Sequence, residues 1–539
     1  MLQMEIKNPY IWLLFKSNFK FMKKLSLLML VCFASVSTII SQTLQIDGIA
    51  GKRFNGVYNI ISPEDGETAG YFTYHRTERG KKGMRSYEFI FTDTTLRSKT
   101  STIIEMHKNA RLNHTVFNGK FMLVSYEDWK NRVFVTQLID KETGNIIKTT
   151  EETVDRKTYN SSTIFPAEKG EGFYIIKGDF VKKQGRGYEL KKVDNNLEEI
   201  WSKTVQAEKG SKYIADLVNS NGRIILWQES NVKSKIKPSI VCRDASTGEV
   251  IYEREGYDGT STILNNQIRI DEEGAVYLGG AYVDKERVDY INNDGIYVLK
   301  IDAEGNDEIY SKVPNKGKIQ PVLRAASSGF TVGSKDKVYV QDLILDNGQI
   351  VVVTEMFRKN LNVTPVVAQA TRDLITGKAI GYVGGYDDNK EKYVFEIMDF
   401  IVFKFGSTGN LDEIKLIEKD GYNKITVWYP YTYYGGVRLA KKMDQFGWFD
   451  YGFAAQNIDG KNIMVCKNNA KPRRPEVYTY TLDESFAQNK INLKQEAKID
   501  LEEAKVGYFN IFRSSDGYFT AAYFQRKLDR ITLNKESYL

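Results

Sequence analysis

The sequence is poor in the residues that build disulfide scaffolds. Three cysteines occur among 539 residues, and Cys32 falls within an apolar run near the N-terminus. The other two, Cys242 and Cys466, each lie in or beside a strand-like apolar segment. A chain of this length can bury a large core without cross-links, and free cysteine usually behaves as a small buried hydrophobe. We therefore expect two core thiols rather than a disulfide.

Histidine is equally scarce, and this argues against several kinds of catalytic site. The three histidines are His75, His107 and His114, all in the first quarter of the chain. Zinc sites and Ser-His-Asp catalysis need ligands or a base drawn together. The sequence contains no His-Glu-x-x-His, no Gly-x-Ser-x-Gly and no glycine loop that would cradle phosphate. A metal site on His107 and His114 is an open alternative, but hydrogen-bonded or solvated histidines are the simpler interpretation, and no metal or cofactor is predicted.

The chain also lacks a strong excess of one charge. Residues 1–41 hold five of the 76 basic and one of the 69 acidic residues, so the remainder carries 71 against 68. Nucleic-acid binding favours a clustered basic face, and this balance predicts no nucleic-acid partner. Outside the N-terminus, no segment is long and apolar enough to span a bilayer.

The N-terminus has the parts of a secretory signal. Met22-Lys-Lys precedes an apolar run over 25–40, and Ser41-Gln42 follows it. A membrane anchor needs about 18 to 20 apolar residues, whereas this run is shorter and interrupted by serine and threonine. We predict a leader over 1–41 whose signal peptide covers 22–41. The mature chain then begins near Gln42 and is exported to the periplasm, the outer cell surface or the medium.

What the chain does contain is a repeated turn. Eight times a glycine-led tight turn opens into a short apolar strand, and the first five copies recur about every fifty residues. A fixed period in this range is the signature of a repeat architecture. The glycines are Gly70, Gly119, Gly172, Gly222, Gly274, Gly348, Gly460 and Gly517.

A second turn follows about 25 residues after the first in several units, as in Glu142-Thr-Gly-Asn145 and Ser246-Thr-Gly248. Hairpin turns need a positive φ, which glycine and asparagine tolerate. Each unit therefore offers four antiparallel strands, and the class is all-β. We predict a β-propeller of seven or eight blades, with eight favoured, because radial stacking leaves only short protected edges. The last unit shows three strands, and Thr43–Ile49 is predicted to supply its fourth. Residues 42–539 then form a single domain.

Two stretches are too long for this scheme. The interval after Gly348 predicts an insertion at about 358–393, read as an extra hairpin and loop. A second excess lies between Asp420 and Phe446, where tyrosines are dense. Aromatic faces with polar tips suit sugar rings or extended peptides, although the same alternation suits a strand that buries one ring face. The predicted binding residues are Tyr429, Tyr431, Tyr433, Tyr434, Arg438 and Trp448.

The chain resembles secreted β-propeller proteins of the Bacteroidota group, many of which belong to uncharacterised families. The resemblance rests on the Lys-rich signal ending in Ser-Gln and on the glycine-strand and Thr-Gly-Asn turns, and it implies no specific activity. Ser514-Ser-Asp-Gly517 matches part of an Asp-box turn, but the following tryptophan is absent and an ordinary hairpin turn is the better interpretation.

We therefore expect a monomeric, non-enzymatic binding or scaffolding protein whose ligand is a glycan or a protein segment. The alternative is a carbohydrate-active enzyme of the glycoside hydrolase type, which would use two carboxylates facing across the central channel. Its candidates on presumed inner strands are Asp216, Asp342 and Asp450. No catalytic residue is assigned.

Overall fold

The structure is a computed structural model, and it describes most of the chain after the predicted leader. The described residues are 42–49, 54–62, 68–77, 83–128, 130–153, 163–181, 185–233, 235–286, 293–325, 336–346, 348–361, 393–427, 436–456, 460–468, 476–483, 485–491, 493, 506–514, 517–525 and 528–538. The predicted leader, 1–41, lies outside them.

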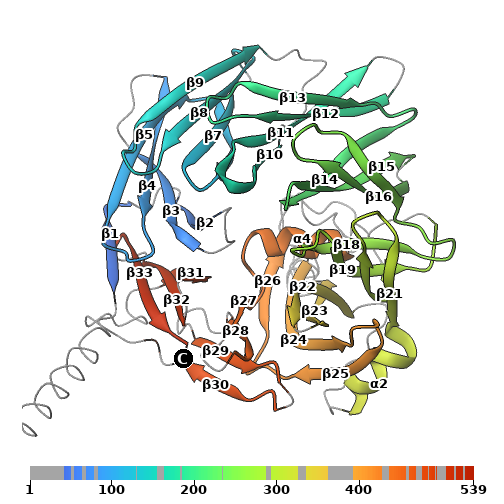
Figure 1. Ribbon diagram of the computed structural model, residues 1–539. Helices are drawn as coiled ribbons and strands as arrows, with labels where there is room; N and C mark the ends of the chain where they lie inside the picture. Colours follow the sequence, from blue (N-terminus) through green and yellow to red (C-terminus); the bar gives the residue numbers. More distant parts are fainter. Residues whose placement is uncertain are drawn as a thin grey trace, which may run out of the picture.

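The described strands form eight four-stranded antiparallel units arranged as a ring (Figure 1). The first unit contains β2 (Phe54–Ile61), β3 (Thr68–Thr77), β4 (Met84–Thr92) and β5 (Lys99–His107). The second contains β6 (Ala110–Phe117), β7 (Phe121–Asp128), β8 (Val133–Asp140) and β9 (Ile146–Thr153). The third contains β10 (Thr163–Pro166), β11 (Phe173–Val181), β12 (Gly185–Val193) and β13 (Glu199–Val205). The fourth contains β14 (Ser211–Ser220), β15 (Arg223–Val232), β16 (Lys235–Asp244) and β17 (Val250–Glu255).

The second half of the chain repeats this arrangement. The fifth unit contains β18 (Thr262–Ile270), β19 (Val276–Val283), β20 (Gly295–Ile301) and β21 (Asp307–Pro314). The sixth contains β22 (Asp336–Asp346), β23 (Gln349–Leu361), β24 (Tyr393–Phe405) and β25 (Leu411–Ile417), with β26 (Asn423–Val427) beside β24. The seventh contains β27 (Tyr451–Gln456), β28 (Asn462–Asn468), β29 (Glu476–Thr481) and β30 (Gln488–Ile491). The eighth contains β31 (Val506–Arg513), β32 (Tyr518–Gln525), β33 (Arg530–Ser537) and β1 (Thr43–Asp47).

The ring closes with strands from both ends of the chain. β1 pairs antiparallel with β33, Thr43 opposite Asn534 and Asp47 opposite Arg530. This confirms the fourth strand predicted for the last unit. The first strands of neighbouring units also contact one another, including β2 with β31. The third and fourth units share a single parallel pair, Arg186 with Ser211, and are otherwise separate blades. The β-propeller prediction is therefore confirmed, and the described strands give eight blades.

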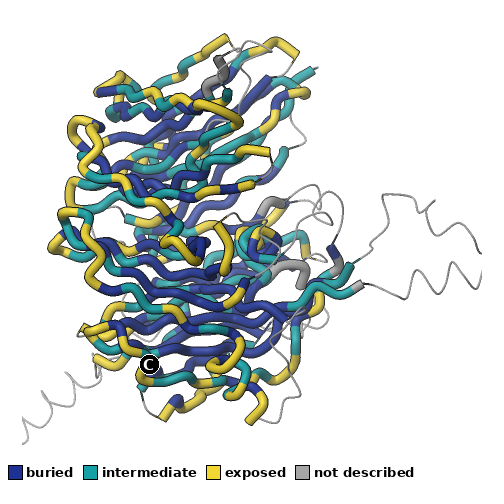
Figure 2. The backbone as a smooth tube through the Cα atoms, turned by 90° about the vertical axis from the view of Figure 1, so that its right-hand side faces the viewer, coloured by how far each residue is buried: buried dark blue, intermediate teal, exposed yellow. Residues whose placement is uncertain are grey.

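The core lies between adjacent sheets. Val298 of β20, Val340 of β22 and Phe403 of β24 belong to one buried cluster that joins the fifth and sixth blades. Burial of a large apolar side chain stabilises a protein by about 1.5 to 3 kcal/mol, so each such interface holds two blades together. Cys242 and Cys466 are both buried and free, as expected. Figure 2 shows the buried strands in dark blue between exposed turns in yellow.

Because consecutive strands are antiparallel, the turns that join first to second and third to fourth strands lie on one face, which we call the lower face. The eighth blade has only the first of these turns, because β33 and β1 come from opposite ends of the chain. The glycine-led turns join first to second strands, and the Thr-Gly-Asn turns join third to fourth strands. Gly172 shows why glycine is required there. Its φ is +108°, and a Cβ at this position would lie 1.9 Å from the carbonyl oxygen of Val193.

The opposite, upper face carries the connections between second and third strands and between blades. The predicted insertion belongs to this face in the topology, since β23 ends at Leu361 and β24 begins at Tyr393. Residues 362–392 lie outside the described residues, so the nature of the insertion stays a prediction. Arg358–Leu361 extend β23 and pair with 393–396 of β24.

The second long stretch contains a helix that the sequence interpretation did not anticipate. α4 spans Gly436–Gln445 between the sixth and seventh blades. Two shorter helical turns, η2 (Asn315–Ile319) and α2 (Gln320–Ala325), connect the fifth blade to the sixth, and η1 (Glu168–Gly170) lies in the β10–β11 turn. Figure 1 shows α4 near the middle of the ring, beside β22.

Candidate functional site

Helix α4 has one apolar and one cationic side. Val437, Leu439, Ala440 and Met443 are buried and pack into a cluster with residues of the fifth and sixth blades. The cationic residues are Arg438, Lys441 and Lys442. An apolar stripe of this kind is what a surface helix needs to stay in place. The tyrosine-rich run before α4 favoured a strand in the sequence interpretation. It concealed the helical spacing of the apolar residues that follow it.

Two of the predicted binding residues are described, and they play different parts. Arg438 is exposed on α4, and its positive charge acts to lower the pKa of Tyr213 on β14, against the larger rise caused by burial. Trp448 follows the helix, is half-buried against the apolar cluster below α4, and lies 5.4 Å from the ring of Phe446. Tyr429, Tyr431, Tyr433 and Tyr434 lie outside the described residues. The proposed aromatic patch therefore stays a prediction, with Trp448 also serving the packing of α4.

The three inner-strand carboxylates do not converge on one another through any contact in the described part of the chain. Asp216 and Asp342 each follow a β-bulge in the first strand of their blade. Asp216 pairs with Lys441 of α4 at 3.5 Å. Asp342 pairs with Arg269 at 2.6 Å and accepts a hydrogen bond from the hydroxyl of Tyr451. Each carboxylate thus has a cation of its own.

Asp450 belongs to a different arrangement, which we call the buried ion cluster: Glu355, Lys419, Asp450 and Lys467. The Nζ of Lys419 donates to Glu355 and, at 2.9 Å, to Asp450. The backbone N–H of Asp450 also donates to Glu355 at 3.1 Å. Burial raises the pKa of Glu355 to about 7 against the opposing charge of Lys419. One cation thus holds two carboxylates from the sixth and seventh blades.

Lys467 completes the cluster, and among the described residues no carboxylate lies in hydrogen-bond contact with it. Its Nζ donates to the carbonyl of Gly447 at 2.6 Å and to the side-chain oxygen of Asn510 at 2.7 Å. Burial lowers the pKa of Lys467 to about 8. These bonds tie the seventh blade to the chain after α4 and to the eighth blade. Because Glu355, Asp450 and Lys467 are buried, we expect changes to these residues to alter the stability of the fold.

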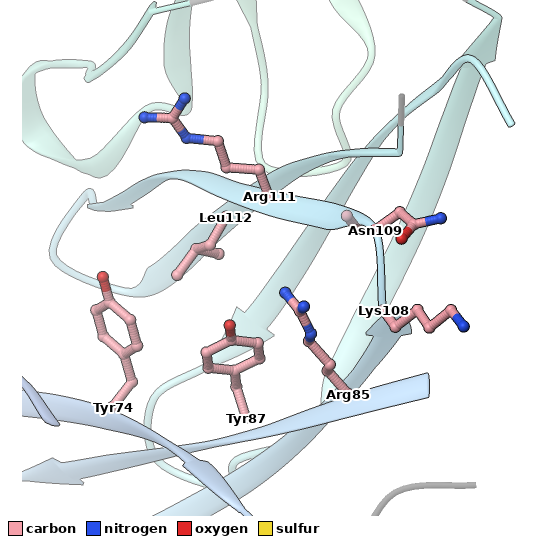
Figure 3. A pocket seen from close by; sticks show the side chains of 8 residues that line it. Tyr74, Arg85, Tyr87, Lys108, Asn109, Arg111 and Leu112 are labelled. Atoms are coloured by element: carbon pink, nitrogen blue, oxygen red, sulfur yellow. The ribbon is translucent and has the colours of Figure 1, made fainter. Parts of the chain in front are cut away.

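An accessible site lies between the first two blades, and we call it the crevice. It has a volume of about 510 Å³, within the usual range of ligand pockets. Tyr74 comes from β3, Arg85 and Tyr87 from β4, and Arg111 and Leu112 from β6 (Figure 3). The crevice is lined by Tyr74, Arg85, Tyr87, Lys108, Asn109, Ala110, Arg111 and Leu112.

Stacked aromatic rings hold one wall of the crevice. Tyr74 stacks on Phe89 at 5.1 Å between ring centroids, and its other neighbours are Tyr58 at 6.0 Å and Tyr87 at 6.5 Å. Alternation along β4 places Arg85 and Tyr87 on the same side of the sheet. In Figure 3 the side chains of Tyr74, Tyr87 and Arg85 rise toward β6, and Leu112 points back at them. The wall is therefore rigid, and it presents hydroxyl and guanidinium groups to the space.

Among the described residues, the lining carries positive charge and no carboxylate. Arg85, Lys108 and Arg111 are its three cations, and the Nε of Arg85 is buried without a hydrogen-bond partner among the described residues. The nearest acid in the strand register is Glu127, opposite Arg111. Burial raises the pKa of Glu127, and the charge of Arg111 works against that rise. The crevice is thus suited to a ligand that brings negative charge.

The histidines are engaged separately. His75 lies 3.5 Å from Glu88, and His107 lies 3.4 Å from Asp128. His114 stands in β6, half-buried. Across the described ranges, no group of three or more histidine, cysteine or acidic side chains is placed to hold a metal ion. The helices in these ranges are too short or too polar to cross a membrane.

Sequence reasoning missed the crevice. The sequence held only a weak signal for this site. Arg85 and Tyr87 are two residues apart on one strand, and Lys108 and Arg111 flank the link between two blades. Similar residues occur at many strand ends in this chain. Only the packing of two neighbouring blades shows which of these side chains share a space.

Comparisons with solved structures give distant likenesses. The WD40 domain of SCAP from fission yeast is 10% identical, with 92% of this chain and 98% of that chain covered at a TM-score of 0.39. The β-propeller domain of the Trilobed protease from Pyrococcus furiosus is 10% identical, with 83% and 100% covered at a TM-score of 0.36. The polysaccharide lyase Uly1 is 10% identical, with 79% and 89% covered at a TM-score of 0.40.

These structures carry different activities, and none is transferred to this chain. A search of curated proteins finds no match. One family model matches residues 21–521, which is most of the chain. This protein belongs to that family, which is described as a family of unknown function (DUF6770).

Proposed function

We propose that this chain is an exported, non-enzymatic binding or scaffolding propeller that holds a glycan or a protein segment on its upper face. The observation that carries the proposal is the crevice, an accessible space with aromatic walls and cations that lack carboxylate partners among its lining residues. Ligand sites in repeat folds lie on connections held by a rigid scaffold. Here the scaffold is the pair of first blades.

Export and a monomeric state are parts of the same proposal. The charged and apolar parts of residues 22–41 support export. The pairing of β1 with β33 supports a closed monomer, because it leaves no blade short of a strand. Exposed outer strands such as β9, with Lys148, Glu151 and Glu152, carry charge that opposes edge-to-edge association.

A carbohydrate-active enzyme is less well supported. That alternative needs two carboxylates facing a common substrate. Asp216, Asp342 and Asp450 instead bond to Lys441, Arg269 and Lys419, respectively.

The test is a glycan-array screen, together with a pull-down of envelope proteins, on the mature chain. We expect Tyr87→Ala to remove binding, because it takes one aromatic wall from the crevice. Tyr518→Ala, on the lower face, is the matched control and should bind as the parent does. Binding that survives Tyr87→Ala unchanged would refute the crevice as the site.

The predicted aromatic patch is tested in parallel. Tyr431→Ala with Tyr433→Ala removes two of its rings. If ligand binding falls in this double variant as well as in Tyr87→Ala, the two regions contact one ligand. If it falls only in the double variant, the site moves from the crevice to the patch.

A further inference from the structure

Beside the crevice, Arg111 extends away from Tyr87 (Figure 3). Its positive charge contributes, after burial, to lowering the pKa of Lys442 on α4. In the described part of the chain, the Nζ of Lys442 donates to the neutral side chain of Gln445 at 2.9 Å.

Few acids offset the cations at the crevice. Lys312 pairs with Asp258 at 2.9 Å and Arg254 with Asp307 at 2.6 Å. Among the described residues, Arg85 and Lys442 form no ion pair of this kind, whereas Arg111 has the buried Glu127 near it. A bound anion would offset the positive charges of Arg85, Arg111 and Lys442. Charge-assisted hydrogen bonds to guanidinium are among the stronger polar contacts available.

The walls of the crevice favour a saccharide over a peptide. Tyr74, Arg85 and Tyr87 come from β3 and β4, and each of these strands is already paired on both edges. Their backbone therefore offers no ladder to an extended peptide, which is the usual source of its affinity at a sheet. β6, which supplies Arg111 and Leu112, pairs only with β7 among the described strands, so the preference for a saccharide rests on the wall formed by β3 and β4. Tyrosine rings offer flat faces and hydroxyl groups, which match the ring and hydroxyls of a sugar.

We propose that the crevice binds an acidic saccharide, whose carboxylate or sulfate groups pair with Arg85 and Arg111. This inference rests on the proposed function, since it names the ligand class of the same site. The shared chemistry is an anionic group on a sugar ring. Uronate and sulfate are its two sources.

The experiment measures binding of the mature chain by titration calorimetry to four probes: polygalacturonate, dextran sulfate, unmodified dextran and poly-glutamate. We expect one of the two acidic saccharides to bind, and the one that binds identifies the anionic group. Unmodified dextran and poly-glutamate should not bind. Added salt should weaken binding, because the pairing is partly exposed to solvent.

The decisive variant is Arg85→Gln with Arg111→Gln. Each lost charge-assisted bond should weaken affinity about tenfold or more, so the double variant should lose about a hundredfold. The control Lys120→Gln with Lys169→Gln removes the same charge from exposed lower-face turns and should bind normally.

Four outcomes would overturn the inference. Absence of binding to both acidic saccharides is one. Equal losses in the crevice variant and its control are another, because they would indicate attraction to net charge alone. Tight binding of poly-glutamate would assign the site to an acidic peptide. A neutral glycan or a protein that needs Tyr87 but not the two arginines would leave the proposed function standing and the acidic ligand wrong.

Discussion

The two faces of this propeller are built by different rules. The lower face consists of short turns in which a glycine adopts a positive φ, and these turns repeat from blade to blade. The upper face carries α4, the long connections, the buried ion cluster and the crevice. Local conformation decides the lower face, because a turn of two to five residues needs little from the rest of the chain. Contacts between distant residues decide the upper face.

Within the upper face, two sets of cations contrast in the same way. Lys419 is buried and bonds to two carboxylates. Arg85 and Arg111 lie at an accessible space whose described lining residues include no carboxylate. Buried charges that are paired specify how two blades meet. Accessible cations with no carboxylate among the described lining residues are available to a ligand. This contrast predicts large effects on stability in the first set and small ones in the second.

The largest expected effect comes from Lys419→Met. Removing this cation leaves Glu355 and Asp450 buried without it, and breaking a buried pair typically costs about 3 to 5 kcal/mol. Urea denaturation should show a fall of this size in the free energy of unfolding. The control is Lys237→Met, whose partner Glu286 and own side chain are both about half exposed. It should cost about 1 kcal/mol or less, and equal losses in the two variants would contradict the contrast.

A somewhat smaller effect is expected on the lower face from Gly172→Ala. The φ of +108° and the 1.9 Å approach of a Cβ to the Val193 carbonyl both oppose the methyl group. Gly222→Ala is the matched control, since its φ is +72° and nothing lies within 4 Å of the added Cβ. We expect about 1 kcal/mol for the control from backbone strain alone. The loss at Gly172 should be about 2 kcal/mol or more by thermal unfolding, and the reverse order would show that turn space does not limit substitution.

Stability should also depend on pH through Asp444 at the end of α4. Burial raises the pKa of this carboxyl to about 6 in the folded protein, from an ordinary value near 4. The folded state therefore holds the proton more tightly than the unfolded state. The stabilising contribution is full below about pH 4 and is lost as pH rises through 6. Relative to Asp444→Asn, the unfolding free energy of the parent should fall between pH 4 and 7, and a parallel pair of curves would disprove this assignment.

The smallest effect is expected from Arg111→Gln. This side chain is exposed, and the substitution removes both its repulsion with Lys442 and its attraction to Glu127. The free energy of unfolding should stay within about 0.5 kcal/mol of the parent. Chemical denaturation of the ligand-free protein is the measurement. A loss like that of Lys419→Met would mean that Arg111 is a structural cation, and the crevice would lose its claim to be a site.

Several features of the fold could be predicted because their causes are local. The alternation of apolar residues, the glycine turns and the strand at Thr43 each depend on neighbours in sequence or on the count of strands per unit. The buried state of Cys242 and Cys466 follows from the same alternation. Helix α4 was missed although its apolar residues were visible, since ten residues after a tyrosine-rich run give a weak periodic signal.

By itself, the sequence determined that this protein is all-β, that four strands form each unit, and that its termini meet in one blade. The two-residue alternation of a strand and the positive φ of a hairpin turn each depend on a few neighbouring residues. Both can therefore be predicted from the sequence. Tertiary structure alone decided which charges meet. Lys419 contacts Glu355, which is 64 residues away in the sequence, and Lys441 of α4 contacts Asp216 of the fourth blade. The crevice likewise exists only where two blades pack together, because it is bounded by side chains that no local pattern connects.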